Sequence, residues 1–181
     1  MTKLADHRPD AAPTASMNRK EAADRRPSKR PSHSIRLLAV ASAGGHWEEL
    51  MLLRPAFEGF DVHYATTLEG FAERERLTKV HVLPDANRHR PLRTIACAWT
   101  CWNVIRSIRP HYVVTTGALP GLTCGLIGRL FGARTIWVDS IANSERLSMS
   151  GTFAGRFAAL SVTQWEHLAQ DDSPAFHGAL L

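Results

Sequence analysis

Cysteine is scarce in this chain, with three residues among 181, and the number is odd. Small secreted domains stapled by disulfides use many cysteines in even number, so this class is excluded. The sequence also lacks any run of about 20 apolar residues, the length that a membrane-spanning helix needs. No apolar stretch follows the first methionine, and we therefore expect no secretory signal.

The positive charge is concentrated at the N-terminal end. The net charge is +5 overall, but residues 1–34 hold eight Lys and Arg against four Asp and Glu, a net of +4. The rest of the chain holds fourteen against thirteen, a net of +1. Because the body is almost neutral, we expect no nucleic-acid partner.

Residues 1–34 are predicted to form a disordered basic tail. Residues 14–34 have almost no large apolar side chain, and such a segment buries too little surface to offset its ordering entropy. The tail is either a solvated extension or a polybasic arm attracted to anionic lipid.

From residue 35 onward, short apolar runs alternate with stretches of helical spacing. The predicted strands are 35–41, 61–66, 79–83, 111–115, 134–138 and 160–164. The predicted helices are 47–57, where Pro55 ends or kinks the helix, 68–76, 92–109, a helix opening at 117–121 and running to 131, and 151–159. This alternation predicts one α/β domain over 35–181, with a doubly wound, mostly parallel Rossmann-like sheet of about six strands.

In such a sheet, ligands bind beyond the carboxyl ends of the strands. The loop after the first predicted strand contains Gly44, Gly45 and His46, where glycines allow close approach of a ligand and the next helix offers free N–H groups. Glu48 and Glu49 follow in the first helical turn and would repel a phosphate. The loop also lacks G-x-G-x-x-G spacing and a Walker lysine, which disfavours a dinucleotide or P-loop site.

His46 has two interpretations at this stage: it caps the helix, or its imidazole accepts a proton from a substrate hydroxyl. The other candidate ligand-binding residues follow later strands, and each has a local alternative as a plain helix start or cap. They are Thr116, Gly117, Asp139, Ser140, Ser148, Ser150 and Gln164.

The helix predicted over 92–109 is apolar around most of its circumference. Residues 94–105 carry no charge and include Trp99 and Trp102, while Arg93 and Arg106 lie toward its ends. Tryptophan beside arginine is typical of a helix in the membrane interface, but a helix held between the sheet and a partner protein has the same composition. Cys97, Cys101 and Cys124 fit no zinc spacing, and we expect them in the core.

Five segments together resemble PssD-type polysaccharide biosynthesis proteins, the bacterial relatives of the membrane-anchoring Alg-fourteen subunit of the dolichol-pathway N-acetylglucosaminyltransferase. The resemblance covers residues 35–181. The segments that carry it, in the same order, are ASAGGHWEEL at 41–50, TTGA at 115–118, DS at 139–140, LSMSG at 147–151 and QW at 164–165.

This resemblance implies the N-terminal half of a GT-B glycosyltransferase such as MurG. A small PssE-like catalytic subunit would supply the UDP-sugar site, and this chain would dock peripherally on the cytoplasmic face of the plasma membrane. Gly44, Gly45 and His46 would face a lipid-pyrophosphate-linked saccharide acceptor, with His46 as the candidate base. Relatives often have Glu where this chain has Asp139, and Thr where it has Ser150. The body has no Asp-x-Asp run to hold a metal ion, which fits a metal-independent GT-B site, and we also expect no cofactor.

Three functions remain open from the sequence. The first is the acceptor-binding subunit of a two-subunit glycosyltransferase that uses UDP-GlcNAc or another UDP-hexose in polysaccharide or oligosaccharide biosynthesis, inactive or weak alone. The second is a non-catalytic scaffold that recruits a competent transferase to the membrane. The third is a free-standing nucleotide-binding protein, which the missing dinucleotide fingerprint disfavours.

Overall fold

The structure is a computed structural model that describes residues 34–86 and 90–180. Residues Ser34–Leu181 form one compact unit. The predicted N-terminal tail lies outside the described residues except for Ser34, so its two interpretations remain predictions.

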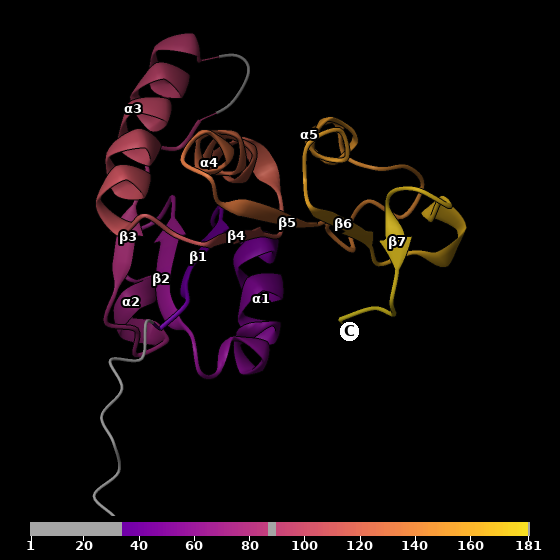
Figure 1. Cartoon of the computed structure of the whole chain (residues 1–181), viewed down its shortest axis with the longest axis horizontal. Coiled ribbons are helices and arrows are strands. Elements are labelled where there is room, and N and C mark those ends of the chain that lie inside the picture. The colour runs from indigo at the N-terminus through magenta and orange to yellow at the C-terminus, as the bar shows by residue number, and fades with distance from the viewer. Residues whose placement is uncertain (1–33, 87–89, 181) are drawn as a thin grey trace, which may run out of the picture. The chain divides into compact units, whose positions relative to one another are not determined.

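The centre of the domain is a seven-stranded, all-parallel sheet in the order β3-β2-β1-β4-β5-β6-β7 (Figure 1). This confirms the predicted α/β class, with one strand more than expected. The missed strand has two residues and no apolar run of its own. The strands are β1 Arg36–Ala41, β2 Asp61–Thr66, β3 Val80–Val82, β4 Tyr112–Thr115, β5 Arg134–Val138, β6 Leu160–Thr163 and β7 Ala175–Phe176.

The predicted helices are present with shifted bounds: α1 and α5 each begin two residues earlier than predicted, and α5 ends five residues earlier. The predicted helix 47–57 is divided, because Pro55 lies in a separate 3-10 turn that begins two residues after α1 ends. The helix expected over 68–76 is shortened because Gly70, in a left-handed conformation, precedes its first residue. The helices are α1 Gly45–Leu52, η1 Arg54–Phe57, α2 Phe71–Arg74, α3 Pro91–Ile108, α4 Ala118–Leu130, α5 Met149–Ala154 and η2 Glu166–Leu168.

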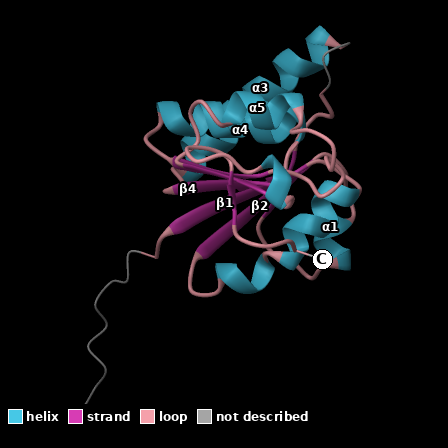
Figure 2. Ribbon diagram, turned by 90° about the vertical axis from the view of Figure 1, so that its right-hand side faces the viewer, coloured by secondary structure: helices cyan, strands magenta, loops and turns pink. Residues whose placement is uncertain are grey.

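Helices cover both faces of the sheet, as a parallel sheet requires. On one face, α3 and α4 pack over Leu38, Val40 and Val113, and α5 lies in the same layer (Figure 2). On the other face, α1 and η1 pack over Leu37, Ala39 and Val114. The alternation of inward side chains along β1 therefore divides the core into two halves.

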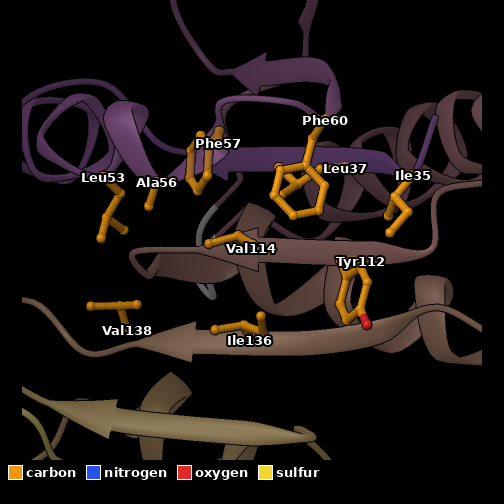
Figure 3. Close-up of a pocket in the computed structure, with 10 residues that line it drawn as sticks. All are labelled: Ile35, Leu37, Leu53, Ala56, Phe57, Phe60, Tyr112, Val114, Ile136 and Val138. Atoms are coloured by element: carbon orange, nitrogen blue, oxygen red, sulfur yellow. The ribbon is translucent and has the colours of Figure 1, made fainter.

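An apolar groove remains open on the α1 face (Figure 3). Its volume is about 420 Å³. Val114, Ile136 and Val138 line the sheet side, and Phe57 and Phe60 stand on the opposite side. Ten apolar or aromatic residues form the groove: Ile35, Leu37, Leu53, Ala56, Phe57, Phe60, Tyr112, Val114, Ile136 and Val138.

The strand order reverses direction between β1 and β4. From β1 the chain proceeds outward to β2 and β3, and from β4 it proceeds the other way to β5, β6 and β7. The loops that follow β1 and β4 therefore diverge, and they leave a space at the carboxyl edge of the sheet. This switch point positions the site described next.

Candidate functional site

Two helices begin at the switch point without side-chain caps. Gly44 precedes α1 with φ of 83°, and Gly117 precedes α4 with φ of 133°. Neither residue provides a capping oxygen, and no side chain in the described part of the chain caps either helix. The partial positive charges at these two helix ends create a local environment that suits an anion.

His46 lies in the first turn of α1, against the loop after β4. A Cβ atom at Gly117 would lie 2.8 Å from Cε1 of the His46 ring, so only glycine leaves room for the imidazole. The Thr116 hydroxyl donates a hydrogen bond of 2.6 Å to the backbone carbonyl of His46. The structure thus brings His46, Thr116 and Gly117 together, as the sequence predicts.

The imidazole of His46 has an unsatisfied nitrogen. Its Nδ1 atom is buried and has no hydrogen-bond partner among the described residues, although the residue as a whole is only half-buried. Buried polar atoms in native proteins are nearly always paired, and Nδ1 of His46 is an exception at a helix N-terminus.

Backbone strain is present at the same place. Ala118, the first residue of α4, has φ of 63°, directly after the positive φ of Gly117. A left-handed alanine costs about 1–2 kcal/mol, and such residues are concentrated at functional sites.

The two glutamates near the loop have partners of their own. Glu48 forms an exposed ion pair of 2.8 Å with Arg74. Glu49 is buried and accepts hydrogen bonds from Ser140 Oγ at 2.6 Å and Gln164 Nε2 at 3.2 Å. Arg74 thus offsets the charge of Glu48 in part, and the Glu49 carboxylate is directed into the protein toward Ser140 and Gln164.

Glu49 has a buried role that the sequence did not predict. Its carboxylate joins α1 to the residues after β5 and β6 through Ser140 and Gln164. Gln164 also donates to the carbonyl of Asp139 at 3.1 Å and accepts from the Leu180 amide at 3.0 Å. The sequence feature that could have indicated this role is the position of Glu49 directly before Leu50, on the buried side of α1.

Asp139 organises the loop between β5 and α5. Its buried carboxylate accepts from Trp137 Nε1, Asn143 Nδ2, and both the amide and the hydroxyl of Ser148. Ser148 Oγ in turn accepts from the Gly151 amide at 2.8 Å, which is the N-cap role noted for it. Both side chains are occupied within the chain, and their contact with an acceptor stays a prediction.

Buried titratable groups also occur away from the switch point. Cys97, Cys101 and Cys124 lie buried between α3 and α4, as expected, and hydrogen bonding among them together with burial raises the pKa of the Cys97 and Cys101 thiols. Burial lowers the pKa of His63 and of His81, whose rings stack at the β2–β3 edge. Among the described residues, no three His, Cys, Asp or Glu side chains are arranged to hold a metal ion.

The outer side of α3 exposes a stripe of large apolar side chains. Leu92, Ile95 and Trp99 are 81%, 66% and 67% exposed, and Trp102 is 39% exposed. Arg93 and Arg106 are also exposed. None of the helices in the described part of the chain is long and apolar enough to cross a bilayer.

Comparison with known proteins identifies relatives of this domain. The chain is 24% identical to UDP-N-acetylglucosamine transferase subunit ALG14 of Mus musculus, over 77% of this chain and 80% of that protein. It is 27% identical to ALG14 of Eremothecium gossypii, over 74% of each. No family model matches the chain.

Solved structures share the fold. MurG of Acinetobacter baumannii superimposes with a TM-score of 0.65 at 13% identity, over 78% of this chain and 45% of that one. A UDP-N-acetylglucosamine 2-epimerase of Rickettsia bellii superimposes with a TM-score of 0.62 at 9% identity, over 82% and 46%. The chain spans less than half the length of these structures. The chain is therefore similar in sequence to ALG14, a UDP-N-acetylglucosamine transferase subunit, and its domain has the Rossmann-like fold found in MurG-like GT-B glycosyltransferases.

Proposed function

We propose that this chain is the acceptor-binding subunit of a two-subunit glycosyltransferase. The complex transfers a sugar from a UDP-sugar, UDP-GlcNAc or another UDP-hexose, to a lipid-pyrophosphate-linked saccharide in polysaccharide or oligosaccharide biosynthesis. The relatives support this assignment, because ALG14 is named as a UDP-N-acetylglucosamine transferase subunit. The observation that supports it most directly is the unpaired Nδ1 atom of His46, which lies near two helix N-termini without side-chain caps.

The geometry suits transfer to a lipid-linked hydroxyl. The acceptor's pyrophosphate lies at the N-termini of α1 and α4, where free N–H groups favour negative charge. The His46 imidazole takes the proton of the acceptor hydroxyl as this oxygen attacks the anomeric carbon, and the bond from that carbon to UDP breaks. Gly117 and Thr116 hold His46 in place, and the Glu49 bonds hold α1.

A small PssE-like catalytic subunit is the proposed partner, and it carries most of the UDP-sugar site. The chain spans 45% of MurG, so the matched region leaves out more than half of that single-chain protein. The open apolar groove of Figure 3 lies over the central strands of a parallel sheet, a place that is normally covered. We assign this groove to the partner subunit, whose docking would bury it.

The layer of α3, α4 and α5 is the proposed membrane-facing surface. Residues 86–138, which include α3 and α4, contain no Asp or Glu, and neither does α5. Exposed Leu92 and Trp99 can enter the lipid interface, while Arg93 and Arg106 attract anionic headgroups. The subunit would then bind peripherally, on the cytoplasmic face of the plasma membrane.

The test is a reconstituted complex that contains the proposed partner, a UDP-sugar and a lipid-linked acceptor. His46→Ala and the milder His46→Asn are both expected to reduce transfer by about 100-fold or more, because general base catalysis contributes 10²–10⁴-fold. Both variants should still bind the partner and vesicles. His177→Ala, at an exposed residue, is the matched control.

Unchanged turnover by both His46 variants would remove this residue from the mechanism. A partner that transfers sugar at full rate without this chain would favour the alternative function, a scaffold that recruits a competent transferase.

A further inference from the structure

A second apolar groove opens at the carboxyl edge of the sheet, on the opposite face from the groove of Figure 3. Its volume is about 660 Å³, and it lies between the first turns of α4 and helix α5. Among the described residues that line it, only Ser150 has a polar side chain. The lining residues are Ala86, Ala118, Leu119, Leu122, Met149, Ser150 and Phe153.

One end of this groove lies at the candidate site. Ala118 lines the groove and directly follows Gly117, which contacts the His46 ring. The strained φ of 63° at Ala118 therefore shapes the junction between the polar site and the apolar groove. A ligand that fits both must be charged at one end and hydrocarbon at the other.

The other end of the groove reaches the proposed membrane-facing layer. Met149 and Phe153 are 75% and 44% exposed, and α5 packs against α4, which packs against α3. Since the helices of this layer carry no acidic residue, it is suited to an anionic lipid. The groove thus connects a surface for lipid with an N-terminal environment for phosphate.

We propose that this groove binds the hydrocarbon chain of the lipid-linked acceptor, at the segment next to its pyrophosphate. The inference rests on the proposed function for the pyrophosphate end, and it adds a separate chain-binding subsite made by Leu119, Leu122, Met149 and Phe153. The hydrocarbon chain passes from the side of His46 along α4 and α5 toward the bilayer. Apolar contact, rather than hydrogen bonding, holds it there.

The test measures binding of three soluble probes by calorimetry without membranes: inorganic diphosphate, geranyl diphosphate and farnesyl diphosphate. Each buried methylene strengthens binding about fourfold, so farnesyl diphosphate should bind about tenfold or more tighter than geranyl diphosphate. Both should bind tighter than inorganic diphosphate. Equal affinity for all three probes would overturn the subsite.

A double variant with a matched control locates the effect. Met149→Ser combined with Phe153→Ser should abolish the dependence on chain length and leave binding of inorganic diphosphate unchanged. Leu130→Ser is the matched control, because this side chain of α4 is 76% exposed and does not line the groove. We expect this variant to bind all three probes like the parent. Chain-length dependence that survives in the double variant would place the hydrocarbon elsewhere.

The reconstituted complex separates the two proposals. Transfer that occurs with equal KM for short-chain and long-chain acceptors would refute the groove and leave the proposed function standing. Binding that depends on hydrocarbon length, without any sugar transfer, would refute the proposed function and leave the groove as a hydrocarbon-binding site. Displacement of farnesyl diphosphate by the partner subunit would also refute the subsite, because the groove would then belong to the protein interface.

Discussion

At the scale of single residues, a missing side chain decides where the candidate base lies. Gly117 has φ of 133°, and the His46 ring lies where a β-carbon of this residue would be. Any β-carbon here would meet Cε1 of that ring at 2.8 Å, so the glycine serves both the backbone and the imidazole.

Gly117→Ala is therefore expected to displace the His46 ring and to reduce sugar transfer by the reconstituted complex about 100-fold, the usual result of a 1 Å misplacement. Steady-state kinetics and circular dichroism check the loss and the fold. Gly59→Ala is the control, because φ is also positive there, at 87°, while a Cβ meets nothing within 4 Å. If Gly117→Ala and Gly59→Ala reduced sugar transfer equally, the loss would come from backbone strain and not from displacement of the His46 ring.

Glu49 matters at this scale because its carboxylate accepts hydrogen bonds from two side chains that follow other strands. Glu49→Ala would leave the Ser140 hydroxyl and the Gln164 amide without their carboxylate acceptor, and we expect a loss of about 3 kcal/mol in the free energy of unfolding. Urea titration measures it. Glu48→Ala, which removes an exposed ion pair in the same helical turn, should change stability little. If the two variants were equally stable, Glu49 would have no bracing role.

At the scale of elements, α3 divides its residues between two environments. Its inner side packs Cys97, Cys101 and Ile105 into the core, while Leu92, Ile95 and Trp99 face outward. The composition alone allowed a membrane or a protein contact for that outer side. The neighbouring helices α4 and α5 also contain no Asp or Glu. This favours the proposed membrane contact, because the whole layer then lacks negative charge that would repel anionic lipid.

The combined variant Leu92→Ser and Trp99→Ser should weaken binding to anionic phospholipid vesicles by about tenfold or more, since burying each side chain contributes about 1.5–3 kcal/mol. Vesicle flotation measures the bound fraction. Leu68→Ser, at a residue 51% exposed outside this layer, should bind like the parent. Retained vesicle binding by the double variant would exclude α3 as the contact.

At the scale of the whole molecule, the domain covers its sheet unequally. The helices α3, α4 and α5 form one layer, while α1, η1 and α2 on the other face leave the groove of Figure 3 open over β4 and β5. The two open grooves lie on opposite faces of the sheet, so a partner and a lipid chain can be bound at the same time.

Phe60→Glu places a charge at the edge of the groove assigned to the partner, where the phenyl ring is 37% exposed. We expect partner binding to weaken by at least about tenfold, because a carboxylate would be buried without a counter-charge. Surface plasmon resonance with the partner immobilised measures the change. Leu68→Glu is the matched exposed control. Undiminished binding of the Phe60 variant would move the interface elsewhere.

The sequence by itself determined the fold class and the chemistry of the switch-point loops. Alternating apolar runs and helical spacing are local signals, and they located β1, β2, β4, β5 and β6 to within one residue at each end. Glycines in the loops before α1 and α4 indicated special backbone conformations, and Gly44 and Gly117 both have positive φ.

Only the tertiary structure decided which residues meet. Thr116 and His46 are 70 positions apart, and Gln164 and Glu49 are 115 apart, so no local pattern encodes these contacts. They arise because the parallel order places the ends of β1, β4, β5 and β6 along one edge of the sheet. The role of Glu49 could not be predicted for the same reason, because its partners Ser140 and Gln164 follow β5 and β6, far along the chain from α1.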